Sequence, residues 1–121
     1  MLNLDTHVLL HALGDKLTPR ERSQLEGDAW GISAIVLWEI AKLAELGRIE
    51  IDLDDPALTR SLARVHVWPL TLDVCRTIRT LDFRGDPADE IIAATSIVHG
   101  AALVTRDAKI RRSRLVPLAG R

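Results

Sequence analysis

Residues 86–107, DPADEIIAATSIVHGAALVTRD, contain a helix signal followed directly by a strand signal. Asp86-Pro87 is typical of a helix start, because aspartate can cap the first turn and proline fits into it. Gly100 is expected to end this helix. The apolar residues 101–105 then predict a buried strand. A helix that leads straight into an apolar strand is typical of an α/β sheet.

The same alternation of helix and strand signals extends over the rest of the chain. It predicts an α/β fold with helices on both faces of one sheet. The expected strands are 1–4, 30–32, 65–70, 101–105 and a last edge strand at 115–117. The expected helices are 6–14, one opened by a capping box at Thr18, 34–46 after Ser33, 56–64, 72–81 after Thr71, 86–99 and one from 108.

Length and composition are those of a folded protein with one domain, residues 1–121, because 13.4 kDa with 47% apolar residues can bury a core. No apolar run approaches the roughly 18 residues that a membrane-spanning helix needs. Residues 1–10 carry Asp5 among their apolar residues and do not resemble a secretory signal. One cysteine, Cys75, excludes an internal disulfide and a cysteine-based zinc site. These features predict a cytoplasmic protein without membrane contact.

Charge is unevenly distributed although the net charge is only -1. The last 16 residues hold one acid and six of the 16 cations. Those cations are Arg106, Lys109, Arg111, Arg112, Arg114 and Arg121. Such a tail is either a solvated surface or a surface that binds anions, since arginine binds phosphate in a bidentate manner.

Four carboxylates occupy positions that we expect to be shielded from water in the folded chain. Asp5 follows the predicted strand 1–4 and Asp107 follows the predicted strand 101–105, so both lie at carboxyl ends, where parallel sheets bind ligands. Glu39 has apolar neighbours on both sides, and Asp89 lies one turn inside the helix that Asp86 opens. A buried carboxylate without a partner costs several kcal/mol. These acids therefore need a structural or functional explanation.

Each acid has a structural interpretation as well as a functional one. Asp5 and Asp107 can cap the helices that follow them. Glu39 can pair with Lys42 on the same helix. The helix dipole alone favours an anion at Asp89.

The functional interpretation is that the acids converge on one cleft at the edge of the sheet. Carboxylates that share a cleft repel one another and need a counterion. Oxygen ligands of this kind select Mg²⁺ or Mn²⁺. Such a site supports metal-assisted attack of water on a phosphodiester.

Four segments carry a family resemblance: LDTHVLL at 4–10, SAIVLWEIAKLAELGRI at 33–49, DPADEIIAATS at 86–96 and LVTRD at 103–107. In order and spacing they resemble the PIN domain, and within that family the VapC-type toxins of bacterial toxin–antitoxin pairs. The resemblance implies a PIN-like three-layer α/β/α fold with a central, mostly parallel sheet. It also implies a Mg²⁺- or Mn²⁺-dependent endoribonuclease that acts on RNA, forms a homodimer and is bound by an antitoxin protein.

The resemblance also assigns roles to individual residues. The family's catalytic and metal-binding acids fall on Asp5, Glu39, Asp89 and Asp107. Asp86 matches an accessory acid, and Thr105 and Ser33 match small hydroxyl residues near the cleft.

Arg106 departs from the family, whose members often carry a small residue beside the fourth acid. It either contacts RNA or weakens metal binding at Asp107. Because an acidic cleft repels phosphate, RNA binding needs cations around it, and we expect Arg106, Arg111 and Arg112 to supply them.

Two other functions fit the same residues: a catalytically inactive PIN-fold binding module, and an RNA-processing nuclease without an antitoxin. An aspartate-based phosphatase would need a second aspartate two residues after Asp5, where the chain has His7. A receiver domain would need an acidic pair before its phosphorylated aspartate and a lysine at a late strand end, and the chain has neither.

Overall fold

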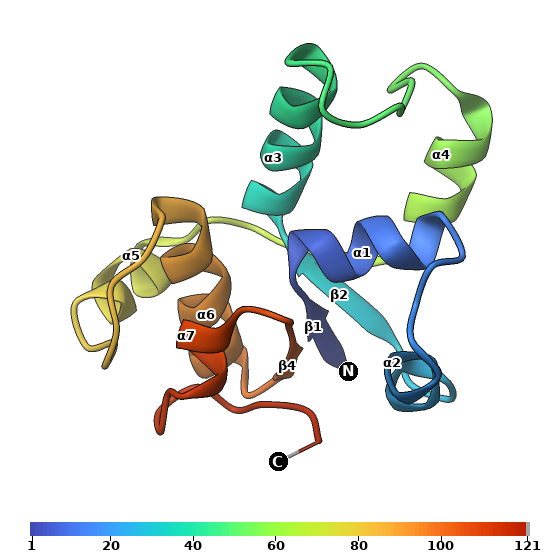
Figure 1. Cartoon of the computed structure of the whole chain (residues 1–121). Helices are drawn as coiled ribbons and strands as arrows, with labels where there is room; N and C mark the ends of the chain where they lie inside the picture. Colours follow the sequence, from blue (N-terminus) through green and yellow to red (C-terminus); the bar gives the residue numbers. More distant parts are fainter. Residues whose placement is uncertain (121) are drawn as a thin grey trace.

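The computed structural model describes residues 1–120, in which four short strands form a parallel sheet. Figure 1 labels β1, β2 and β4 of this sheet. The strands are β1 (Leu2–Leu4), β2 (Trp30–Ser33), β3 (His66–Trp68) and β4 (Ala102–Val104). Their order across the sheet is β3-β2-β1-β4, and every neighbouring pair is parallel. The parallel sheet expected from the sequence is therefore confirmed, with β1 in its centre and the carboxyl ends of β1 and β4 side by side.

The helices within residues 1–120 begin at the capping residues that the sequence indicates. They are α1 (Thr6–Leu13), α2 (Pro19–Leu25), α3 (Ala34–Glu45), α4 (Pro56–Leu62), α5 (Leu72–Ile78), α6 (Pro87–His99) and α7 (Ala108–Arg111). Thr18 and Glu21 form the predicted capping box at α2. Gly100 ends α6 in a left-handed conformation, with φ 63°. No helix in this range is long and apolar enough to cross a membrane.

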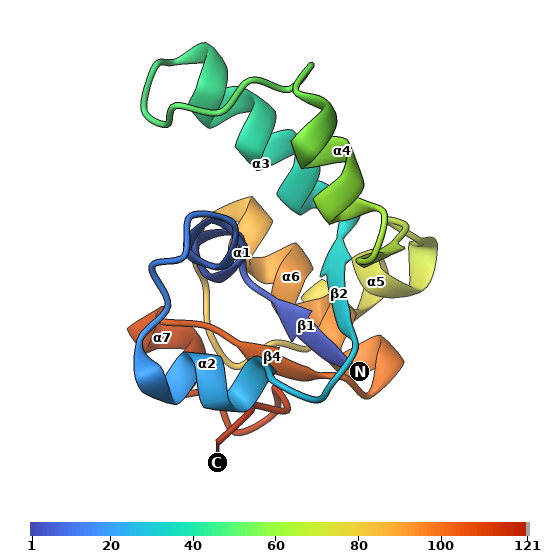
Figure 2. The same cartoon turned by 90° about the vertical axis from the view of Figure 1, so that its right-hand side faces the viewer.

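The helices cover both faces of the sheet, which gives the predicted three layers. In Figure 1, α5 and α6 lie to the left of the strands and α2 and α4 to the right. Figure 2, turned by 90°, shows α6 behind the strands, α2 on the near side and α4 above the strands. Helix α6 packs across β1, β2 and β4. The chain therefore places the first turn of α6 at the same sheet edge as the ends of β1 and β4.

A buried polar contact fixes α6 on the central strand. The side-chain amide of Asn3 on β1 donates to the Ile92 carbonyl (3.1 Å) and to Ser96 Oγ (2.9 Å). Asn3 is fully buried among the apolar residues of the core, which include Leu4, Ile32, Ile92 and Leu103. Since hydrogen bonds in an apolar interior are costly to break, this contact fixes the position of α6 along β1.

Two strand predictions differ from the structure. The expected strand 65–70 is shorter, because β3 ends at Trp68, immediately before Pro69, which has no N–H to donate. The predicted edge strand at 115–117 is wrong. This segment contributes an isolated bridge between Leu103 and Leu118, supported by a bond from the Leu103 N–H to the Pro117 carbonyl (2.8 Å).

Candidate active site

A hollow of about 400 Å³ lies where β1 and β4 end, and it gathers the carboxylates that the sequence singles out. We call it the acidic hollow. It is lined by Asp5, Thr6, His7, His11, Glu39, Asp86, Asp89, Arg106 and Asp107. All four predicted acids and Asp86 therefore meet at one site, although they come from positions up to about a hundred residues apart in the sequence.

Asp5 is the most deeply placed of these acids, with only 5% of its surface exposed. One carboxylate oxygen accepts the Thr6 N–H (2.7 Å), which is the capping contact of α1. The other accepts the Thr105 hydroxyl (2.5 Å). The same Thr105 oxygen accepts the Asp107 N–H (3.0 Å). Asp5 thus caps α1 as predicted and also lines the acidic hollow, and Thr105 links it to Asp107.

Glu39 projects into the acidic hollow from α3. It accepts a hydrogen bond from the Thr6 hydroxyl. The alternative pairing with Lys42 is wrong, because Lys42 contacts Glu45 instead (3.5 Å). Burial raises the pKa of Glu39, and the negative charge of Asp5 raises it further although the Thr6 bond opposes both. Sequence reasoning missed Thr6, whose position directly after Asp5 is the only available signal.

Asp86 and Asp89 reach the hollow from the start of α6. Asp86 occupies the N-cap position, but its side chain makes no capping hydrogen bond, so the structural role expected for that side chain is wrong. Burial raises the pKa of Asp89 to about 7, and the charges of Asp5, Asp107, Glu39 and Asp86 add to the rise. The carboxylates therefore repel one another across the hollow, as expected for a site that needs a cation.

Asp107 and Ser33 differ in where their side chains lie. Asp107 caps α7 by accepting the Ile110 N–H (3.1 Å), and it also lines the acidic hollow. Ser33 caps α3 by accepting the Ile35 N–H (3.3 Å) and is almost fully buried. Ser33 does not line the hollow. Thr105 does not line the hollow either, but its hydroxyl contacts Asp5, whereas within residues 1–120 Ser33 forms no hydrogen bond with the acids of the hollow.

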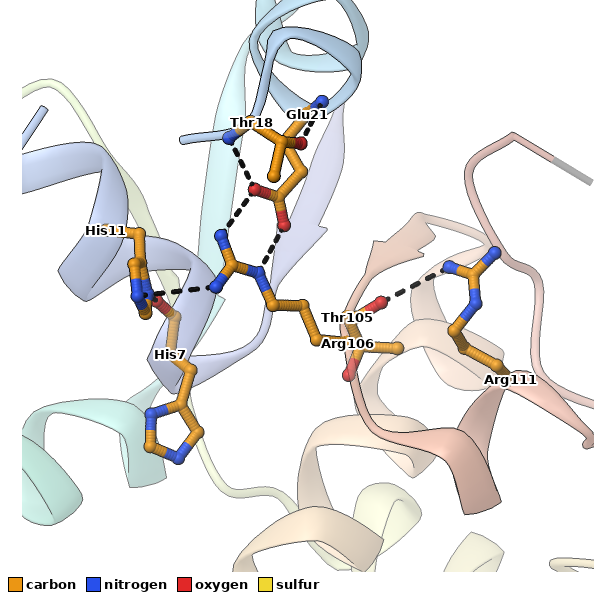
Figure 3. A network of polar contacts seen from close by, with 7 residues as sticks. All are labelled: His7, His11, Thr18, Glu21, Thr105, Arg106 and Arg111. Atoms are coloured by element: carbon orange, nitrogen blue, oxygen red, sulfur yellow. Dashed lines mark hydrogen bonds and ion pairs between the residues drawn. The ribbon is translucent and has the colours of Figure 1, made fainter. Parts of the chain in front are cut away.

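Arg106 forms a bidentate ion pair that the sequence did not indicate (Figure 3). Its Nε and Nη2 donate to the two oxygens of Glu21, each at 2.6 Å. Glu21 also accepts the Thr18 N–H (2.9 Å), as part of the capping box of α2. We call this contact the Glu21–Arg106 bridge. It joins α2 to the segment between β4 and α7, and it compensates the charge of an arginine that was expected to face RNA.

The other side of the Arg106 guanidinium contacts α1. Nη1 lies 3.3 Å from His11 Nε2, and His11 Nδ1 lies 2.6 Å from the His7 carbonyl. If Nδ1 carries the proton, both contacts are satisfied by a neutral His11 ring. Arg111 points away from Arg106 in Figure 3, and its Nη1 donates to the Thr105 carbonyl (3.2 Å). Two of the three predicted RNA-binding arginines therefore hold the β4–α7 segment in place.

The Glu21–Arg106 bridge makes stability depend on pH at the acidic end of the range. The hydrogen bonds from Arg106 lower the pKa of Glu21 from 4.5 to about 2. The stabilisation is therefore complete above pH 4.5 and is lost as the pH falls toward 2. Because the Arg106 side chain is 40% exposed, solvent reduces the effect, and we expect Glu21→Gln to cost about 1–2 kcal/mol at pH 7.

Urea unfolding at pH 7 and pH 2.5 measures this effect. The difference between Glu21→Gln and the unmodified protein should fall to about a quarter of its pH 7 value at the lower pH. The exposed Glu26→Gln, at the other end of α2, is the matched control and should change little at either pH. An equal loss at both pH values would show that the ion pair is not responsible.

Comparison with known proteins identifies the family of the chain. Residues 3–114 match the PIN domain family. The chain belongs to the PIN domain family. This finding confirms the resemblance that the four segments indicate, and the match extends from β1 to beyond α7.

Relatives of this PIN domain include toxin–antitoxin proteins. The chain is 36% identical to Ribonuclease VapC22 of Mycobacterium tuberculosis in a 117-residue alignment that covers 92% of this chain and 90% of the relative. Its fold is similar to that of VapBC2 from Rickettsia felis bound to a promoter DNA fragment, with TM-score 0.74 and 21% identity. That match covers 98% of this chain and 97% of the other chain. A toxin–antitoxin complex from Klebsiella pneumoniae matches with TM-score 0.70 and 20% identity, and the match covers 93% of this chain and 91% of the other chain.

Proposed function

We propose that this PIN domain is a metal-dependent endoribonuclease and the toxin of a toxin–antitoxin pair. One observation carries the proposal: a single hollow gathers five carboxylates in a chain that is 36% identical to a protein named as a ribonuclease. An acid cluster of this kind cannot bind a phosphodiester without a cation, because like charges repel. A bound metal ion removes that obstacle.

Carboxylate donors suit Mg²⁺ or Mn²⁺. Between residues 1 and 120, no three His, Cys, Asp or Glu side chains are already arranged to hold a metal ion. Mg²⁺ does not require such a cage, because it keeps several waters and binds through one or two carboxylates. Burial and then repulsion by the neighbouring acids raise the pKa of Asp89, and a dication would relieve that repulsion. The donor set and its electrostatics therefore fit a hydrated divalent ion.

In this proposal Asp5, Glu39, Asp89 and Asp107 would hold the metal together, one or two of them by direct contact and the others through its bound waters. The ion supplies an activated water and stabilises negative charge on the phosphate. Thr105 orients Asp5 and positions the Asp107 backbone, and Thr6 orients Glu39, so that each carboxylate presents a fixed oxygen to the hollow. Asp86, exposed at the rim and free of a capping bond, is the accessory acid.

The protein partners follow from the same family membership. We propose a cytoplasmic homodimer that an antitoxin inhibits. Apolar side chains are exposed on α3 and at its C-cap, where Trp38 is 56% and Leu46 is 61% exposed. We expect this surface, together with α4, to form the contact between the two copies. Large exposed apolar patches commonly mark protein interfaces. Light scattering of the purified chain distinguishes a dimer from a monomer.

The predicted RNA contacts of Arg106, Arg111 and Arg112 remain a prediction. Arg106 and Arg111 already have protein partners in Glu21 and Thr105. The exposed Arg112 side chain is the remaining candidate of the three. An RNA strand would therefore have to draw its main compensating charge from other cations around the acidic hollow.

The function is tested by incubating the purified protein with a pool of RNAs in Mn²⁺ and in EDTA. We expect cleavage in Mn²⁺ and none in EDTA. The midpoint of thermal unfolding should also rise in Mn²⁺, because the ion binds only the folded state. Neither cleavage nor a rise in the midpoint would favour the inactive binding module. If the protein cleaves RNA and no small DNA-binding protein from an adjacent reading frame inhibits it, the RNA-processing nuclease is favoured.

A further inference from the structure

A second hollow, of about 610 Å³, adjoins the acidic hollow and differs from it in charge. The two share Asp86, Asp89 and Asp107 as a common wall. The far wall of the second hollow is formed by Arg84 and Gly85, before α6, and by Ala108 and Lys109 on α7. We call it the outer hollow. It places two cations directly beyond the acids.

Lys109 reaches across the outer hollow. Its Nζ donates to the Arg84 carbonyl (3.3 Å), so the ammonium extends from α7 to the segment before α6. An ammonium has three donors, and this contact uses one of them. Within residues 1–120, Lys109 forms no ion pair with a carboxylate.

Arg84 is anchored by its own part of the chain. Its Nη1 donates to the carbonyls of Leu81 (3.2 Å) and Phe83 (2.9 Å), which leaves Nε and Nη2 as further donors. Like Lys109, Arg84 forms no ion pair with a carboxylate inside the described range. Arg106, the other cation that lines either hollow, is compensated by Glu21. Arg84 and Lys109 are therefore the uncompensated cations of the two hollows.

We propose that the outer hollow is a phosphate subsite, in which Lys109 and Arg84 bind the RNA phosphate next to the one that is cleaved. The inference rests on the proposed ribonuclease function. A strand whose scissile phosphate lies in the acidic hollow continues over the shared wall of acids, where cations immediately beyond offset the repulsion. Lysine binds phosphate as a point charge and arginine binds it through several N–H groups. Neither contact reads a base, so the subsite favours RNA binding of any sequence.

The proposal is tested by the salt dependence of RNA binding in an inactive Asp5→Asn background. The probe is a fluorescein-labelled, single-stranded RNA of mixed sequence, followed by anisotropy in Mn²⁺ at several salt concentrations. Each lost phosphate contact reduces the slope by about 0.7 for single strands. We expect Arg84→Gln/Lys109→Gln to reduce it by about 1.4 and Lys109→Gln alone by about 0.7. Lys109→Arg, which keeps the charge, should retain the slope.

The matched control is Arg76→Gln/Arg79→Gln, which removes the same charge from α5, outside both hollows. The subsite is rejected if the two double variants have the same slope. Arg112→Gln then shows whether the basic residues after β4 bind the RNA instead. In the cleavage-competent protein, Arg84→Gln/Lys109→Gln should raise KM and leave kcat nearly unchanged, because the contact exists before and during cleavage. Absence of cleavage by the unmodified protein would reject the ribonuclease function, and the binding slopes would still decide whether the subsite exists.

Discussion

Replacing Asp5 by Asn should reduce RNA cleavage at least about a thousandfold, which corresponds to about 4 kcal/mol of activation free energy. The substitution removes one negative charge from the proposed metal ligands. It also disturbs the local hydrogen bonds, because both Asp5 oxygens accept, one from the Thr6 N–H and the other from the Thr105 hydroxyl. An asparagine amide has a single oxygen, so it can satisfy only one of these donors in the same way.

The measurement is the initial rate on a fluorogenic RNA in Mn²⁺, with circular dichroism to verify the fold. Asp54→Asn is the matched control, since it removes the same charge from an exposed position before α4, outside the acidic hollow. The control should cleave at the rate of the unmodified protein. A folded Asp5→Asn protein that retains that rate would remove Asp5 from the active site.

Asp89→Asn should make the metal-free protein more stable at pH 8 and leave its stability unchanged at pH 4. The pKa of Asp89 is raised from 3.8 to about 7, first by burial and then by the neighbouring acids. As the pH rises through this interval, the unfolded chain loses the proton before the folded one, so folding becomes less favourable. The penalty is complete above pH 7 and should amount to about 2–4 kcal/mol. The amide removes it.

Urea unfolding in EDTA at the two pH values measures the difference. Glu90→Gln, which removes a charge from the same turn of α6 but does not line either hollow, should show no such gain. Addition of Mn²⁺ at pH 8 should then stabilise the unmodified protein more than Asp89→Asn, because the ion loses one ligand in the variant. Equal effects at pH 4 and pH 8 would exclude repulsion among the acids as the cause.

Most of the fold could be predicted from the sequence because its signals are local. Thr18, Ser33 and Thr71 mark helix starts through contacts within three residues, and the structure contains each of those contacts. Gly100 marks a helix end for an equally local reason. The signal at residues 115–117 is not local in this sense. These residues have strand composition, but a strand forms only if they pair with β4, and only an isolated bridge forms beside them, at Leu118.

The acidic hollow was predictable for a topological reason. Parallel strands end at one sheet edge, so Asp5 and Asp107 had to meet once the strands were placed. Contacts between side chains were not predictable in this way. Glu21 lies 85 residues from Arg106, and the choice of Thr6 over Lys42 as the partner of Glu39 depends on how α1 packs against α3. Such pairings are decided by packing in three dimensions, which helix periodicity does not encode.

The position of β1 in the sheet has a consequence for how the protein is made. Of the four described strands, β1 is synthesised first although it lies inside the sheet, and its Leu2, Asn3 and Leu4 pair on one side with Ala102, Leu103 and Val104. The Asp5 N–H completes this seam by donating to the Val104 carbonyl (3.0 Å). A nascent chain that has not yet reached Asp107 therefore lacks at least one residue that β1 or the acidic hollow requires. Since contacts between distant parts of a chain form late, the acidic hollow is assembled only after the segment with Thr105 and Asp107 has been synthesised.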